Sequence, residues 1–111
     1  MPPDNPTLAV RRRARERQVP AGGHHFTVRR PLAAELLQPM AGLDVVLRFT
    51  LGWDLVNADL MPGGTPDPEP FDAALFRDFI EDRPDLWEPL AEAIMSLWHE
   101  HESTREQAAK N

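Results

Sequence analysis

The sequence predicts a mainly α-helical fold: a small helical domain of three to four helices, with at most one short β-hairpin near the N-terminus. Two observations favour this fold class. Over most of the chain after residue 31, apolar residues recur every three or four positions, the period of an amphipathic helix. Only residues 24–30 alternate apolar and polar side chains with the period of a strand. The chain of 111 residues has the length of one domain.

Residues 1–23 are predicted to be a flexible, basic N-terminal arm. Prolines near its start and the sequence PAGG at 20–23 interrupt regular structure. Between them, Leu8 and Val10 are too few to build the apolar face of a core helix. We therefore expect residues 1–20 to be dispensable for folding. Gly22 and Gly23 could form the turn of a hairpin that leads into residues 24–30.

A helical domain is predicted over residues 24–102. Its first helical segments are 32–41 and 44–59, with Asp44 as a natural N-cap of the second. Gly52 inside this second helix costs about 1 kcal/mol relative to Ala, which suggests close packing at that point.

The second half of the domain has clearer boundaries. Residues 61–70 contain four prolines and two glycines and predict a loop. Asp72 is the predicted N-cap of the next helix, with Phe71 and Phe76 at the positions of a hydrophobic staple. The last helix is predicted to begin near Asp85, and residues 103–111 form a polar C-terminal tail as a fraying helix.

The candidate binding residues lie on this last helix, whose apolar face is wider than one small core requires. The candidate protein-binding residues are Trp87, Ala91, Met95 and Trp98. The simpler interpretation is core packing, in which Trp53 and Trp98 join one core with Phe49, Phe76 and Leu90. An exposed tryptophan would instead be a binding anchor, because Trp is enriched at interface hot spots.

Charge is distributed unevenly along the chain. Residues 1–31 carry seven arginines against two acidic residues, a net charge of +5, whereas residues 32–111 carry −11. The run of arginines at 11–17 could bind phosphates. The acidic remainder would repel a duplex, so nucleic acid is not the expected partner. A solvated arm, or one that docks on an acidic protein surface, is favoured instead.

No catalytic residue, cofactor-binding residue or metal site is predicted, so the protein is not expected to be an enzyme. His24 and His25 are adjacent, and His99 and His101 are two apart, whereas a zinc-binding helix needs histidines four apart. The acidic residues are interpreted as helix caps and solvated surface. The chain has no cysteine, and no apolar run approaches the roughly 20 residues needed to span a bilayer.

Several phrases nevertheless resemble a known family. They are FTVRRP (26–31), LGWDLVN (51–57), MPGGT (61–65), PFD (70–72) and DRPDLWEPLAEAIM (82–95). In this order, between a basic arm and a polar tail, they resemble small tail-assembly-chaperone-like proteins of long-tailed bacteriophages and prophages. The resemblance covers roughly residues 24–111. These are structural phrases and not catalytic motifs.

The resemblance implies a largely helical chaperone that coats the tape-measure protein, keeps it soluble and recruits tail tube protein. It implies action in the host cytoplasm and absence from the mature virion, with homo-oligomerisation left open. Many such proteins also have a longer form made by a −1 frameshift. The ending Ala109-Lys110-Asn111 can be encoded by a shift-prone heptamer, which agrees with that expectation.

Two other functions remain open at this point. One is a generic helical protein-binding adaptor that is not involved in tails. The other is a small nucleic-acid-binding regulator that uses the Arg-rich arm.

Overall fold

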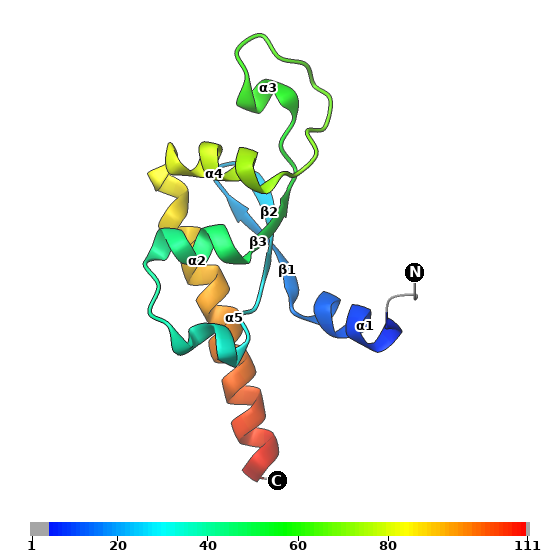
Figure 1. The fold of residues 1–111 in the computed structure, drawn as a ribbon, viewed down its shortest axis with the longest axis vertical. Coiled ribbons are helices and arrows are strands. Elements are labelled where there is room, and N and C mark those ends of the chain that lie inside the picture. Colours follow the sequence, from blue (N-terminus) through cyan, green and yellow to red (C-terminus); the bar gives the residue numbers. More distant parts are fainter. Residues whose placement is uncertain (1–4, 111) are drawn as a thin grey trace.

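The computed structural model describes residues 5–110 and shows an α+β fold, in which helices pack on a three-stranded antiparallel sheet (Figure 1). The strands, in the order β1-β2-β3, are β1 (Glu16–Ala21), β2 (His24–Arg29) and β3 (Thr50–Trp53). The α-helices are α1 (Pro6–Ala14), α2 (Gly42–Phe49), α3 (Asn57–Leu60), α4 (Ala73–Glu81) and α5 (Trp87–Lys110). Two 3-10 helices are η1 (Ala33–Leu37) and η2 (Pro84–Leu86). Residues 1–4 of the predicted arm and residue 111 of the predicted tail lie outside the described residues.

The prediction of a mainly helical domain with at most one hairpin is wrong, because a third strand completes a sheet. β3 occupies the middle of the helix predicted over residues 44–59, and α2 ends at Phe49. The free edge of β2 offers amide and carbonyl groups that need partners, and β3 supplies them. Gly52 also disfavours a helix interior. In the strand it packs closely against Thr27, because a Cβ at Gly52 would lie 3.4 Å from the Thr27 side chain.

The hairpin suggested by Gly22 and Gly23 is confirmed. Both residues have positive φ, 58° and 81°, as the two central positions of a type I′ turn require. β1 therefore lies within the segment predicted to be an arm, and Ala21 is buried in the core. Pro20 led the sequence-based prediction away from a strand here. It is tolerated because β1 is an edge strand that is paired on only one side.

The core lies between the sheet and the helices α2, α4 and α5. On β2, Phe26 and Val28 are fully buried, whereas Thr27 between them is half-buried, as alternation along a strand requires. The buried apolar cluster consists of Ala21, Phe26, Val28, Val45, Val46, Phe49, Phe76, Ile80, Leu86, Leu90, Ile94 and Leu97. Trp53 packs against this cluster, in edge contact with Phe76 at 6.1 Å between ring centroids.

The predicted N-terminal end of α4, with Asp72 as its cap, is confirmed. The Asp72 side chain accepts a hydrogen bond of 2.9 Å from the Leu75 amide, and the rings of Phe71 and Phe76 pack at 5.4 Å. Residues 61–70 contain no helix or strand, as predicted. By contrast, Asp44 does not cap α2, whose N-cap is Ala41.

The two remaining helical segments also differ from the prediction. Only the short 3-10 helix η1 forms in the predicted helix 32–41. α5 begins two residues after Asp85, and it continues as a regular helix to Lys110 through the predicted tail.

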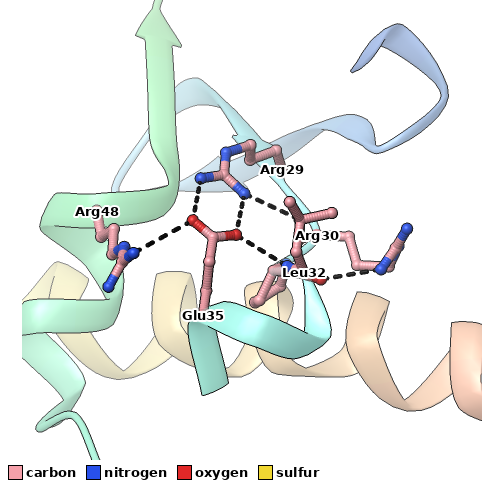
Figure 2. A network of polar contacts seen from close by, with 6 residues as sticks. Arg29, Arg30, Leu32, Glu35 and Arg48 are labelled. Atoms are coloured by element: carbon pink, nitrogen blue, oxygen red, sulfur yellow. Dashed lines mark hydrogen bonds and ion pairs between the residues drawn. The ribbon is translucent and has the colours of Figure 1, made fainter. Parts of the chain in front are cut away.

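A cluster of charged side chains joins the sheet to η1 and α2 (Figure 2). Arg29 donates two hydrogen bonds to the Glu35 carboxylate, at 2.8 and 2.7 Å, and Arg48 approaches the same group at 3.5 Å. The Leu32 amide donates a further bond of 2.9 Å. The Glu35 side chain is only 15% exposed, so these bonds act in a partly desolvated place. The Arg29 hydrogen bonds lower the pKa of Glu35 to about 2.

This cluster makes stability depend on pH below neutrality. A carboxyl whose pKa is lower in the folded than in the unfolded protein stabilises the fold above its unfolded pKa. We expect Glu35→Gln to lower the free energy of unfolding by about 2 kcal/mol at neutral pH. The difference from wild type should shrink as the pH falls from 4.5 toward 2. Urea unfolding across this range measures it. Glu106→Gln, an exposed matched control on α5, should show no such window, and an equal effect of both variants would contradict the prediction.

The two parts of the N-terminal segment, before and after residue 15, contribute differently to the stability of the fold. α1 contributes no buried residue, whereas β1 supplies the buried Ala21 and pairs along β2. We therefore no longer expect all of residues 1–20 to be dispensable for folding, but only residues 1–14. Removing residues 1–14 should leave the melting temperature nearly unchanged. Removing residues 1–21 should lower it by about 8 °C or more, as loss of a strand worth about 2 kcal/mol would in a domain this size. Equal melting temperatures of the two truncations would show that β1 adds nothing.

Candidate protein-binding surface

The four candidate binding residues lie along one face of α5, at successive helical turns. Trp87, Ala91, Met95 and Trp98 are each half-buried. The helix begins here because Arg83, followed by Pro84, turns the chain out of α4. Arg83 also binds the Asp85 carboxylate, with hydrogen bonds of 3.0 and 2.9 Å.

Trp87 is fixed at the corner between α4 and α5. Its indole nitrogen donates a hydrogen bond of 2.5 Å to the Ile80 carbonyl at the end of α4. The rest of the ring packs against the core and is half-buried. Because its polar atom has a partner, the exposed part of the ring presents mainly apolar surface in a fixed orientation.

Trp87 and Ala91 line a groove between α5 and the beginning of α2. Its other lining residues are Ala41, Gly42, Leu43, Glu88 and Glu92. The groove has a volume of about 420 Å³ and mainly apolar walls, with the two glutamates as its charged groups. We call it the α2–α5 groove. An open apolar recess beside acidic side chains has the character of a binding site for another apolar chain segment.

Small residues at the start of α2, Ala41 and Gly42, form part of one wall of this groove. Gly42 is exposed, and a Cβ built on it meets no heavy atom within 4 Å. The sequence did not predict this wall, because the second helix was expected to begin at Asp44, whereas α2 begins at Gly42. The signal available in the sequence was two small residues, Ala41 and Gly42, immediately before a strongly amphipathic segment.

Met95 and Trp98 do not line the groove. Met95 packs against the core farther along α5. Trp98 lies outside the core cluster, half-buried, with its ring 5.7 Å from that of His101. The structure thus places two of the four candidate residues in the groove and two farther along α5, and it does not place Trp98 in the core with Trp53.

The histidines make local contacts with carboxylates. The His25 amide and ring nitrogen Nδ1 lie 3.0 and 3.1 Å from the two oxygens of Asp54, and His24 approaches the same carboxylate at 3.8 Å. The amide of His25 is the main cause that lowers the pKa of Asp54. Within residues 5–110, no group of three or more His, Cys, Asp or Glu side chains is arranged to hold a metal ion.

Comparisons with known proteins add no family to this description. No family model, curated protein or solved structure matches the chain. None of the helices between residues 5 and 110 is both long and apolar enough to cross a membrane.

The position of Trp98 outside the core predicts a small effect on stability. Leu90, which is fully buried on the same helix, provides the comparison. We expect Leu90→Ala to lower the free energy of unfolding by about 3 kcal/mol. Trp98→Ala should lower it by only about 1 kcal/mol, since the ring is partly solvated in the folded state. Urea denaturation of both variants measures the difference. A cost for Trp98→Ala as large as that for Leu90→Ala would place Trp98 in the core.

Proposed function

We propose that this protein is a tail assembly chaperone that binds an apolar helical segment of a tape-measure protein in the α2–α5 groove. In this function it keeps the tape-measure protein soluble and helps to recruit tail tube subunits. The single observation that carries the binding part is the groove itself. Its apolar walls include Gly42, at which a Cβ meets no heavy atom within 4 Å, and the fixed ring of Trp87. The identity of the partner rests on the resemblance of residues 24–111 to chaperone-like proteins of long-tailed phages.

The shape and chemistry of the groove support a helical ligand. A helix that docks in an apolar groove inserts side chains spaced three or four residues apart, and helical tape-measure segments can present such a stripe. Glu88 and Glu92 lie one turn apart on α5 beside the apolar walls. They favour basic residues next to the inserted stripe of the partner.

The acidic character of the chain supports a chaperone function. A chaperone that presents apolar surface must stay soluble when it is free, and residues 32–111 carry a net charge of −11. Because burial of apolar area drives the association, binding in the groove should survive moderate salt.

Filling the groove should therefore weaken binding without unfolding the protein. Gly42→Gln adds a side chain where a Cβ meets nothing, so the fold should be preserved. Ala73→Gln is the matched control, since Ala73 is exposed and is the first residue of α4 as Gly42 is of α2. We expect Gly42→Gln to reduce affinity for the binding fragment about tenfold, or about 1.4 kcal/mol, while Ala73→Gln leaves it unchanged.

The partner is identified by co-expression with fragments of the tape-measure protein from the same genome, followed by pull-down at low and high salt. Retention of an apolar helical fragment at both salt concentrations, lost in Gly42→Gln, is the expected result. If no fragment is retained or made soluble, the chaperone proposal is wrong. Binding that Gly42→Gln does not affect would show that the partner binds at another surface and not in the groove.

A further inference from the structure

A second concave site lies where α1, the end of the β1–β2 ladder and the second half of α5 meet. It has a volume of about 260 Å³ and is lined by Arg11, Ala14, Arg15, Arg30 and His101. We call it the arginine junction. Its residues come from three segments far apart in the sequence, so only the tertiary structure brings them together.

The backbone fixes two of these arginines opposite one another. The strand register pairs Glu16 with Arg29, and the next pair outward is joined by a hydrogen bond of 2.8 Å from the Arg30 amide to the Arg15 carbonyl. Like charges at opposed positions on paired strands destabilise the pairing unless a counter-charge is present. Arg11 lies one helical turn before Arg15 and adds a third positive charge on the same side of α1.

Two of the neighbouring carboxylates, Glu35 and Glu100, bind other arginines. Glu35 is held by Arg29 and Arg48, and Figure 2 shows the head of Arg30 directed away from it. Glu100 is bound by Arg17 at 3.2 Å. It lies with Glu16 in an adjoining recess that Arg15, Arg30 and His101 also line. Within residues 5–110, no ion pair is formed by Arg11, Arg15 or Arg30.

Burial and the neighbouring positive charges both disfavour the charged forms of Arg30 and His101. Partial burial and then Arg15, Arg11 and Arg29 lower the pKa of Arg30. Partial burial and then Arg30 and Arg105 lower the pKa of His101, with Glu102 acting in the opposite direction. A bound anion would relieve this repulsion.

We propose that Arg11, Arg15, Arg30 and His101 form a binding site for phosphate groups. Three arginines line one small recess, whereas a single carboxylate carries one charge and satisfies one guanidinium fork. A diphosphate or triphosphate offers several oxygens and several negative charges in a small volume, which matches the donors better. The phosphates can come from a free polyphosphate or from a nucleic-acid chain, and the test separates the two sources.

The test measures binding of inorganic pyrophosphate and, separately, of a single-stranded oligothymidine to the full chain by isothermal titration calorimetry at low salt. We expect pyrophosphate to bind and Arg15→Gln to weaken it about tenfold, as for loss of one charge-assisted hydrogen bond. Arg77→Gln removes the same charge from an exposed position on α4 and should change affinity less than about twofold. Tighter binding of the oligonucleotide, with a steeper dependence on salt, would show that the site binds the phosphates of a nucleic-acid chain.

The ring signals of the histidines in NMR spectra provide a second measurement that does not depend on affinity alone. Pyrophosphate should shift the signals of His101 and leave those of His24 and His25 in place. Three outcomes would overturn the proposal. One is that neither ligand binds and His101 does not shift. Another is that Arg15→Gln and Arg77→Gln weaken binding equally, which indicates an effect of net charge. The third is self-association in sedimentation that Arg15→Gln abolishes, because the junction would then bind carboxylates of a second copy.

Discussion

The burial of two side chains on the central strand is the constraint on which the rest of this structure depends. Phe26 and Val28 of β2 are completely removed from solvent, and each contributes about 1.5–3 kcal/mol by that burial. They point to the same side of the sheet, so the helices that cover them must lie on that side. The ring of Phe26 contacts Phe76 of α4 at 6.3 Å between centroids, and α5 supplies Leu90, Ile94 and Leu97 to the same core.

The position of α2, and with it one wall of the groove, follows from the strand by a short chain of contacts. Arg29 is the last residue of β2, and its guanidinium both binds Glu35 and lies 4.7 Å above the ring of Phe49. Arg48 of α2 approaches the same carboxylate, as Figure 2 shows. These contacts hold η1 and the end of α2 against the sheet. Because α2 is a single short helix, fixing its end also fixes its start, where Gly42 lines the groove.

α5 connects the two candidate sites. Trp87 and Ala91 line the groove in its first turns, whereas His101 lies in the arginine junction fourteen residues after Trp87. At 1.5 Å of rise per residue this separates the two sites by about 20 Å along one helix. One molecule of this protein therefore has room to bind a helical partner in the groove and a phosphate-bearing ligand at the junction at the same time. Charge follows the same division, since glutamates accompany the groove and arginines the junction.

Local sequence determined the features whose cause is local. The loop at 61–70 follows from its prolines and glycines, the start of α4 from the cap Asp72, and the hairpin turn from Gly22 and Gly23. The apolar stripe that includes Trp87 and Ala91 was also readable, because its period is that of a helix.

Tertiary structure alone decided β3, the groove and the arginine junction. Residues 44–59 carry apolar residues at helical spacing, but the chain leaves the helix after Phe49 because the open edge of β2 needs a hydrogen-bonding partner. No periodicity along one segment can reveal an unpaired edge made by another segment. The groove needs Gly42 beside Trp87, and the junction needs Arg15 beside Arg30 and His101. Each of these pairs is far apart in sequence, so packing of the core brings its members together.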